Sequence, residues 1–263
     1  MSEVVVLKLG GSIITKKREG KLEVDKGNLT RLSKEISETL KEKKIKLVVV
    51  HGAGPFGHVL AKKYALSGGL KSNSQIEGMA LTHQSMEFLN SQVVHALQKA
   101  GVVAISFQPS VAGVLKNREL VSFQLDTLNR MLDLGLVPVA YGDVLLDLDT
   151  GINILSGDHL VPYLAREIPA DRVVIATDVD GIYESDPKDG CKEKSNLITK
   201  NNKGDFKLSG SKACDVTGGM QRKVEELLSL SDAGIKSQII SGLIPEETKK
   251  ALLGKSDSGT FIK

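Results

Sequence analysis

The chain has 263 residues, of which 41% are hydrophobic and 25% are charged, an ordinary composition for a globular protein. A chain of this length buries about three quarters of its extended surface on folding, so it needs no disulfide or metal for stability. The formal net charge of +3 is too small to indicate a nucleic-acid partner. Glycine is frequent (26 residues), tryptophan is absent and aromatic residues make up only 4%. This composition favours an α/β enzyme that handles phosphate over a carbohydrate-binding or base-stacking protein.

The sequence contains no pattern that indicates a metal centre or a membrane span. Cys191 and Cys214 lack CxxC spacing and the five histidines form no HExxH motif, so we expect neither a structural zinc site nor a disulfide framework. The N-terminus runs directly into an apolar stretch without a basic leader, and no apolar run approaches the ~20 residues of a membrane helix. We therefore expect a cytoplasmic protein.

Short β-branched runs alternate with amphipathic helical patterns along the whole chain. Strands are expected at 4–9, 45–50, 102–107, 136–140, 172–176 and 237–240. Helices are expected at about 25–43, 74–100, 122–134, 158–167 and 219–233. The polar stretch 183–215 is expected to be a loop or hairpin near a site. The alternation predicts an α/β fold, a three-layer αβα sandwich around a largely parallel open sheet.

Three glycine-rich turns follow apolar strands. They are KLGGS at 8–12, HGAGPFGH at 51–58 and TGGM at 217–220. Glycine lets backbone N–H groups approach an anion closely, and a helix N-terminus adds positive potential. A parallel sheet gathers such turns along its carboxyl edge, where ligands bind. One such turn alone would indicate only a tight connection, but three of them, each with a lysine or histidine nearby, predict a phosphate site.

Two familiar nucleotide motifs are excluded. Gly52-x-Gly54-x-x-Gly57 matches the dinucleotide fingerprint, but that fingerprint requires a second strand ending in an acid about 20 residues later. Residues 71–77 are polar and then helical, so they supply no such strand. The GxxxxGK[ST] pattern is absent from the sequence as well. A nucleotide site in this chain would therefore use another architecture.

Three lysines lie close to the glycine turns. Lys8 lies at the end of a buried strand, where it must face a carboxylate or a phosphate. Lys17 lies in a loop that can fold back over the first turn, and Lys223 follows the third turn by one helical turn. Asp158 is expected to cap the helix that it begins, and it could also hold two lysines in register. This set is suited to phosphoryl transfer, which depends on positioning and charge neutralisation.

Other polar residues near the strand ends have two possible roles. Asp178 and Asp180 could be turn formers, or they could contact a nucleotide ribose or a magnesium ion. His58 could be an ordinary polar residue at a helix N-terminus. Because His51 and His58 flank one glycine-rich loop, we prefer a functional role for His58.

Motifs spread over nearly the whole chain resemble those of the amino acid kinase superfamily. They are KLGGS at 8–12, TDVDGIY at 177–183 and TGGMQRK at 217–223. Further motifs are similar to those of the isopentenyl phosphate kinases within this superfamily. They are ITxK at 14–17, HGxGxFGH at 51–58, YGDV at 141–144 and SGD at 156–158.

The resemblance implies MgATP-dependent conversion of isopentenyl phosphate to isopentenyl diphosphate, with Mg²⁺ bound through the nucleotide phosphates. It implies one domain, 1–263, with an acceptor lobe at about 1–165 and a nucleotide lobe at about 166–263. It also implies a cytoplasmic homodimer with small-molecule substrates and no nucleic-acid or membrane partner.

By the same resemblance, Lys8 stabilises the transferring phosphoryl group, Lys17 clamps the ATP phosphates and His58 donates a hydrogen bond to the acceptor phosphate. Lys223 is the lysine on the nucleotide side, and Asp158 is the organising carboxylate. The residues expected to contact the nucleotide are Lys8, Gly10, Gly11, Ser12, Gly54, Asp178, Asp180, Tyr183, Gly219 and Lys223. The residues expected to contact the acceptor are Ala53, His58, Met79, Thr82, Val144, Ile154, Leu155 and Gly157.

Three alternatives remain open. A fosfomycin kinase resembles this family closely, and a UMP kinase is a more distant possibility. An amino acid acceptor would require a carboxylate-binding arginine in the central helix, and none is evident. The mostly apolar acceptor set suits a C5 alkenyl tail. A non-catalytic nucleotide-binding module is disfavoured because the lysines, the histidine and the carboxylate of the expected site occur together.

Overall fold

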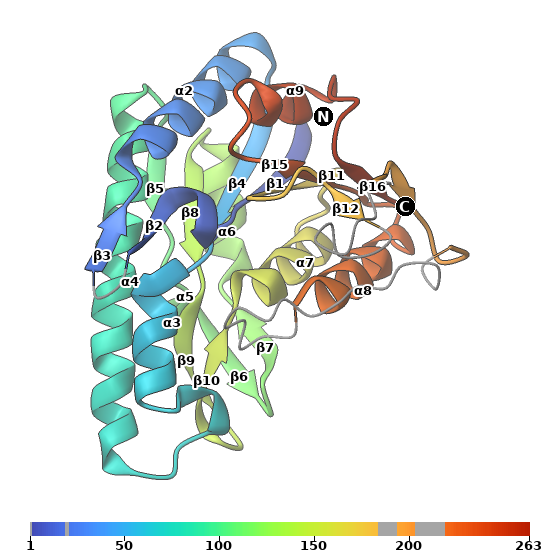
Figure 1. Ribbon diagram of the computed structural model, residues 1–263. Helices are drawn as coiled ribbons and strands as arrows, with labels where there is room; N and C mark the ends of the chain where they lie inside the picture. Colours follow the sequence, from blue (N-terminus) through green and yellow to red (C-terminus); the bar gives the residue numbers. More distant parts are fainter. Residues whose placement is uncertain (1, 19–20, 184–193, 203–218) are drawn as a thin grey trace.

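The protein is described by a computed structural model covering residues 2–18, 21–183, 194–202 and 219–263 (Figure 1). The first half contains β1 (Glu3–Leu9), α1 (Gly11–Ile14), β2 (Thr15–Arg18), β3 (Lys21–Val24), α2 (Lys26–Glu42), β4 (Ile45–His51), α3 (Gly54–Lys63), η1 (Leu66–Gly68), α4 (Asn73–Lys99), β5 (Ala104–Ser106), α5 (Pro109–Ala112), β6 (Gly113–Lys116), β7 (Glu119–Phe123) and α6 (Leu125–Asp133). The second half contains β8 (Val137–Tyr141), β9 (Asp143–Asp147), β10 (Gly151–Leu155), α7 (Gly157–Glu167), β11 (Arg172–Thr177), β12 (Ile182–Tyr183), β13 (Lys194–Ser195), β14 (Leu197–Ile198), α8 (Gly219–Ser231), β15 (Lys236–Ser241), α9 (Glu247–Leu253) and β16 (Thr260–Ile262).

The main sheet has eight strands in the order β14-β16-β15-β11-β1-β4-β8-β5. Adjacent strands in this sheet run parallel to each other, except that β15 and β16 are antiparallel. The central strand β1 pairs with β4 on one side and with β11 on the other. The carboxyl ends of these three strands therefore meet at the same edge of the sheet, where the first glycine turns lie.

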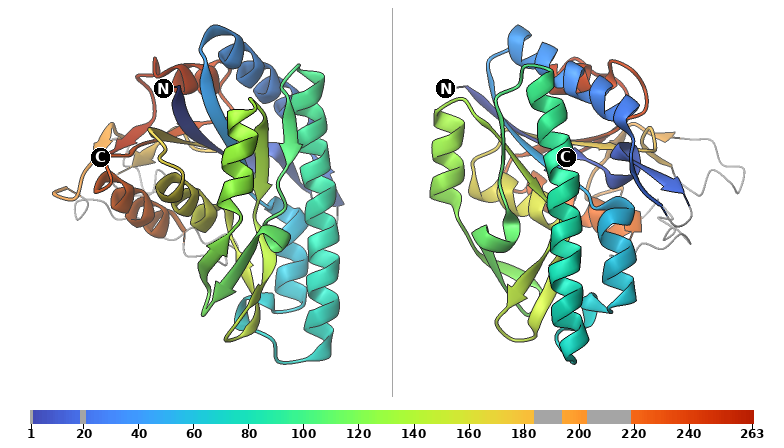
Figure 2. Two further views of the ribbon diagram at one scale, coloured as in Figure 1. Left: turned by 180° about the vertical axis from the view of Figure 1, so that it is seen from behind. Right: turned by 90° about the vertical axis from the view of Figure 1, so that its left-hand side faces the viewer.

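Helices cover both faces of this sheet (Figures 1 and 2). Buried side chains of α2, α4 and α9 pack on one face, and those of α6, α7 and α8 pack on the other. Successive residues of β1 alternate between the faces, so Val5 and Leu7 join the first cluster and Val6 the second. Lys8 follows the same alternation and points toward α7. The three-layer α/β architecture predicted from the sequence is confirmed.

A second sheet of four strands, β10-β9-β6-β7, was not predicted. It lies beside α3 and the lower part of α4 (Figure 1). The helix expected at 122–134 begins only at Leu125, because Glu119–Phe123 pairs with β6 in an antiparallel hairpin. The strand expected at 102–107 is limited to Ala104–Ser106, the residues that pair with β8. Both differences arise because pairing with a distant or neighbouring strand overrides local pattern.

The start of α7 also differs from the expectation. Its N-cap is Ser156, whose side chain accepts a hydrogen bond from the backbone N–H of His159 at 3.3 Å. Asp158 lies in the first turn of the helix, not at the cap. Its carboxylate is therefore available to other partners.

Within the described ranges, no helix is long and apolar enough to cross a membrane.

Candidate active site

The first two glycine turns touch each other at the carboxyl edge of the main sheet. The N–H of Gly10 donates to the carbonyl of Ala176 on β11, and that of Gly52 donates to the carbonyl of Leu9 on β1, both at 2.8 Å. A Cβ atom built on Gly11 would lie 2.3 Å from the backbone nitrogen of Gly54. Only residues without side chains allow this approach. The two turns therefore form one backbone surface of the kind that binds phosphate groups.

Beside this surface, one carboxylate holds two lysines. Lys8 on β1 forms an ion pair with Oδ1 of Asp158 on α7, and Lys8 is only 5% exposed. Lys223 on α8 places its Nζ 3.7 Å from the same oxygen. The cluster thus joins three elements that are distant in sequence. It also confirms the expectation that Asp158 could hold two lysines in register.

The electrostatics of this cluster keep Asp158 ionised. Burial by itself would raise the pKa of the Asp158 carboxyl, but the charges of Lys8 and Lys223 outweigh burial and lower that pKa to about 2. Two ammonium groups and one carboxylate leave a net charge of +1 at the centre of the cluster. Such a cluster attracts a phosphate and can neutralise charge that develops on it.

His51, at the end of β4, supports the second glycine turn from behind. It is completely buried, and this burial lowers its pKa to about 4, so the imidazole is neutral. Its Nδ1–H donates to the carbonyl of Gly52 at 3.0 Å, and Nε2 accepts from the side-chain amide of Asn90 at 3.2 Å. The ring stacks on Tyr141 with 5.4 Å between centroids. His51 is therefore a structural residue.

His58 has a different environment. It lies on α3 after the same glycine turn and is exposed. Ala53 is the N-cap of α3, and Gly157 is the first residue of α7. A Cβ on Gly157 would lie 3.4 Å from Cε of Lys8, which places this backbone beside the lysine. The structure thus brings Gly157, one of the expected acceptor residues, close to the cluster.

The segment after β11 forms a second polar group. Asp180 accepts a hydrogen bond from the Tyr183 hydroxyl at 2.7 Å, and Lys194 Nζ lies 3.4 Å from its other oxygen. Burial opposes ionisation of Asp180, but these contacts outweigh it and lower its pKa. Asp178 accepts from the Thr177 hydroxyl at 3.1 Å. β12 and β13 pair antiparallel, and β14 pairs with β16 at the edge of the main sheet. The described part of the segment expected to be a loop or hairpin therefore contains short paired strands.

The expected acceptor-tail residues separate into two groups. Met79, Val144 and Ile154 belong to one small apolar cluster between α3, α4, β9 and β10, in which Val144 and Ile154 are cross-strand partners. Thr82 is buried on α4, and its hydroxyl donates to the carbonyl of Gly78 at 2.7 Å. Leu155 does not join them. It packs in the core cluster on the α7 side of the main sheet, because it faces the opposite side of β10 from Ile154.

Several expected residues can be placed only in part. The backbone of Lys17 lies in β2, opposite Leu22 of β3, while its side chain lies outside the described structure. Gly219 begins α8, and the two residues that precede it in the third glycine turn are outside the described residues. Cys191 and Cys214 also fall outside. In the described ranges, no group of three or more His, Cys, Asp or Glu side chains could hold a metal.

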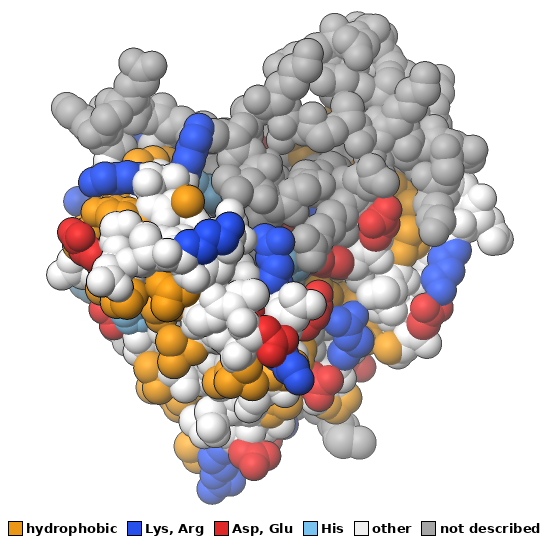
Figure 3. Space-filling view, turned by 90° about the horizontal axis from the view of Figure 1, so that it is seen from below, with side chains coloured by type: hydrophobic (Ala, Val, Ile, Leu, Met, Phe, Trp, Pro, Cys, Tyr) orange, Lys and Arg blue, Asp and Glu red, His pale blue; other side chains and the backbone are white. Residues whose placement is uncertain are grey.

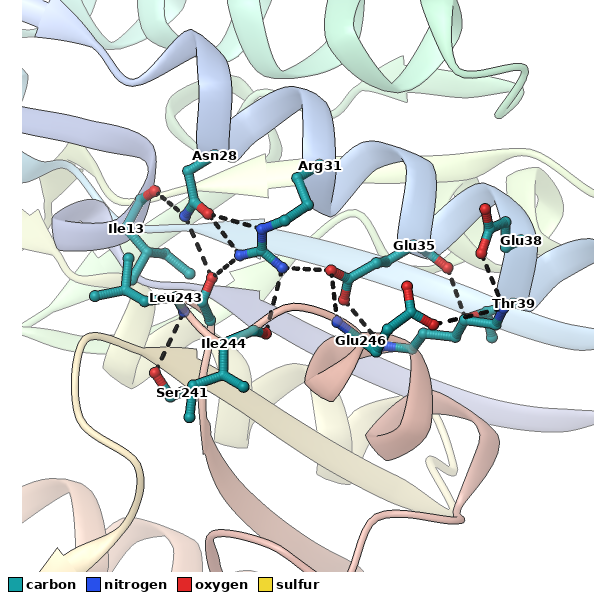
Figure 4. A network of polar contacts seen from close by, with 12 residues as sticks. Ile13, Asn28, Arg31, Glu35, Glu38, Thr39, Ser241, Leu243, Ile244 and Glu246 are labelled. Atoms are coloured by element: carbon teal, nitrogen blue, oxygen red, sulfur yellow. Dashed lines mark hydrogen bonds and ion pairs between the residues drawn. The ribbon is translucent and has the colours of Figure 1, made fainter.

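A polar network anchored on α2 holds the segment after β15 (Figure 4). Arg31 donates to the carbonyls of Gly242 and Ile244 and forms an ion pair with buried Glu35. The Glu35 carboxylate also accepts from the backbone N–H of Glu246 at 3.1 Å. The network therefore fixes this loop against α2.

The same network reaches the first glycine turn. The side-chain amide of Asn28, also on α2, donates to the carbonyl of Ile13 at 2.6 Å and to that of Gly242 at 3.3 Å. Ile13 lies in α1, the short helix directly after Gly10. The network thus supports the backbone surface from outside the site.

The structure adds supporting residues that the sequence analysis did not identify, chiefly Asn90 and Asn28. For Asn90 a signal exists, because it lies on the buried stripe of α4 that Met86, Leu89 and Val93 define. A polar residue on an apolar stripe indicates a buried partner. For Asn28 we find no comparable signal.

On the face seen from below, basic and acidic side chains of the described residues are interspersed (Figure 3).

The charges of the lysine–carboxylate cluster are suited to phosphoryl transfer. A model of the Amino acid kinase family matches residues 3–241, and the chain belongs to this family. The isopentenyl phosphate kinase of Methanothermobacter thermautotrophicus is 35% identical over 265 residues, covering 98% of each chain. That of Methanocaldococcus jannaschii is 36% identical over 266 residues, again covering 98% of each chain. A crystal structure of an isopentenyl phosphate kinase has a TM-score of 0.87 at 33% identity, covering 99% of this chain and 100% of that one.

Proposed function

We propose that this protein transfers the γ-phosphoryl group of ATP to isopentenyl phosphate, forming isopentenyl diphosphate and ADP. The observation that carries the proposal is the cluster of Lys8, Asp158 and Lys223 beside two touching glycine turns. The likeness to isopentenyl phosphate kinases over nearly the full length of the chain supports the choice of acceptor.

In the proposed reaction, an oxygen of the acceptor phosphate attacks the γ-phosphorus, and the bond from that phosphorus to the β-phosphate oxygen breaks. A phosphate monoester has a second pKa of about 6, so the attacking oxygen is already ionised near neutral pH. The protein therefore needs no strong general base. Its task is to hold the two phosphates in line and to neutralise charge on the transferring group.

The residues divide these tasks by position. Lys8 would contact the transferring phosphoryl group, and Lys223 the nucleotide phosphates. His58, exposed on α3, would donate a hydrogen bond to the acceptor phosphate. Lys17 would contribute a further positive charge that binds the ATP phosphates. Asp158 would contact no substrate and would act by holding the two lysines.

The nucleotide would lie on the side of β11 and α8. Asp178, Asp180 and Tyr183 follow β11 and would contact it there, with the backbones of Gly10, Gly11, Ser12, Gly54 and Gly219 near its phosphates. As in the family that the chain resembles, Mg²⁺ would enter with ATP, bound to the nucleotide phosphates. We further propose a cytoplasmic homodimer with an acceptor lobe at about 1–165 and a nucleotide lobe at about 166–263.

A small apolar tail would occupy the cluster of Met79, Val144 and Ile154 next to Thr82. This lining favours an alkenyl phosphate over fosfomycin or UMP, whose polar or bulky groups would lose hydration there without gaining partners. The experiment is a turnover assay with MgATP and five acceptors: isopentenyl phosphate, dimethylallyl phosphate, fosfomycin, UMP and acetylglutamate. We expect the highest kcat/KM with the first two. Preference for any other acceptor would contradict the proposal.

A further inference from the structure

Two helices that contribute to the lysine–carboxylate cluster carry a second pair of charges directly beside it. His159 follows Asp158 on α7, and Glu226 lies three residues after Lys223 on α8. Nε2 of His159 lies 3.4 Å from Oε1 of Glu226, and both side chains are 22% exposed. The two helices pack against each other (Figure 1). Two ion pairs therefore link α7 to α8, one next to the other.

The order of charges is opposite on the two helices. On α7 an acid, Asp158, precedes a base, His159, whereas on α8 a base, Lys223, precedes an acid, Glu226. Residues three apart on a helix share a face, so the α8 pair points toward α7 together. A slide of α8 by one turn would bring Glu226 to Asp158, and the two carboxylates would repel. The arrangement thus favours one register of α8 against α7.

We propose that His159 and Glu226 are positioning residues whose ion pair fixes α8 against α7 and so holds Lys223 at Asp158. This inference rests on the proposed function, in which Lys223 contacts the nucleotide phosphates. When His159 is protonated, its charge and that of Glu226 cancel, so the pair adds no net charge to the cluster. It therefore acts through the position of Lys223 and not through the net charge of the site.

The lysine positioned in this way is sensitive to small movements. Its Nζ lies 3.7 Å from Asp158, a longer contact than that of Lys8. Lys8 lies on the central strand of the sheet and is held by its neighbours, whereas Lys223 depends on the placement of a helix. Misplacement of a catalytic group by about 1 Å can cost up to about 100-fold in rate.

The test uses Glu226→Gln and His159→Asn, which remove one charge each with little change in shape. For each variant we expect kcat to fall about 10-fold and the KM for the acceptor to stay unchanged, because neither side chain is among those proposed to contact the acceptor. His159→Lys keeps the positive charge and should recover most of the activity. Glu167→Gln, an exposed acid at the far end of α7, is the matched control and should behave as wild type.

The decisive comparison is made in a Lys223→Met background. If Glu226 acts through Lys223, Glu226→Gln causes no further loss of kcat or of ATP affinity there, with ATP affinity measured by calorimetry. An equal loss in both backgrounds, or no loss in either single variant, would overturn the proposal. ATP affinity tests the pair even if the wild type fails to turn over isopentenyl phosphate, an outcome that would count only against the proposed function.

Discussion

Lys8 and Asp158 lie 150 residues apart in the chain and form an ion pair at the carboxyl edge of the main sheet. Lys8 is almost completely buried, so its charge requires this partner. The pairing follows from the alternation of β1, which turns Lys8 toward α7, and from the N-cap at Ser156, which leaves Asp158 in the first turn of that helix. Lys223 joins the same carboxylate from α8.

Lys8→Ala should lower kcat by on the order of 100-fold or more, because charge on the transferring phosphoryl group loses its buried counterion. The fold should persist, since Asp158 keeps Lys223. The measurements are kcat with saturating MgATP and isopentenyl phosphate, and the melting temperature. Turnover near the wild-type value would make Lys8 a structural residue.

Asp158 should make folding stability depend on pH. Its pKa is lowered to about 2 in the folded protein, so its contribution is present above the unfolded pKa of about 4 and is lost as pH falls through the folded pKa. The shift corresponds to about 2 kcal/mol at neutral pH. Urea unfolding of wild type and Asp158→Asn should therefore differ at pH 6 and converge near pH 2. A constant difference between the two proteins at all pH values would refute the assignment.

His58→Ala should impair use of the acceptor much more than binding of ATP, because the proposed imidazole contact is to the acceptor phosphate. His58→Gln should recover part of the activity, since its amide can donate a hydrogen bond. KM and kcat for isopentenyl phosphate are compared with the ATP dissociation constant. His95→Asn, an exposed histidine on α4, serves as the control. Unchanged acceptor kinetics in the alanine variant would remove His58 from the site.

Met79→Ala and Leu155→Ala should have different effects. Met79 contacts the apolar cluster of Val144 and Ile154, so its truncation should open room for a longer tail such as that of geranyl phosphate. Each added buried CH₂ contributes up to about 0.8 kcal/mol. Leu155 packs in the other core, so Leu155→Ala should cost about 2–5 kcal/mol of stability without changing acceptor preference. The ratio of kcat/KM for the C10 and C5 acceptors decides between the two positions.

Gly11→Ala should disrupt the backbone surface, because the new Cβ would lie 2.3 Å from the nitrogen of Gly54. We expect a loss of about 1–3 kcal/mol in unfolding free energy together with weaker ATP binding. Gly27→Ala is the control, since a Cβ there meets only the Asp25 carboxylate at an ordinary 3.6 Å. Equal behaviour of the two variants in urea unfolding and ATP titration would show that the turns can move apart.

Much of the fold was predictable because it depends on local pattern. The apolar runs of β1, β4 and β11 and the amphipathic pattern of α2 are sequence properties, and alternating strands and helices allow few arrangements. The hairpins of the second sheet were missed, since strands such as Glu119–Phe123 owe their conformation to a neighbouring strand. The glycine turns were visible because glycine is favoured where two backbones approach too closely to leave room for a Cβ.

The layered α/β fold, the glycine turns at the strand ends and the charged residues near them could therefore be predicted from local sequence. Which of these charges meet could not, because that depends on how distant segments pack. Packing places Lys8 and Lys223 on one carboxylate and His159 against Glu226. It also turns Leu155 away from the small apolar cluster that contains Met79, Val144 and Ile154. The physical reason is that side-chain pairing depends on the direction of a strand face or helix register, and both are set by packing between segments that are far apart in the chain.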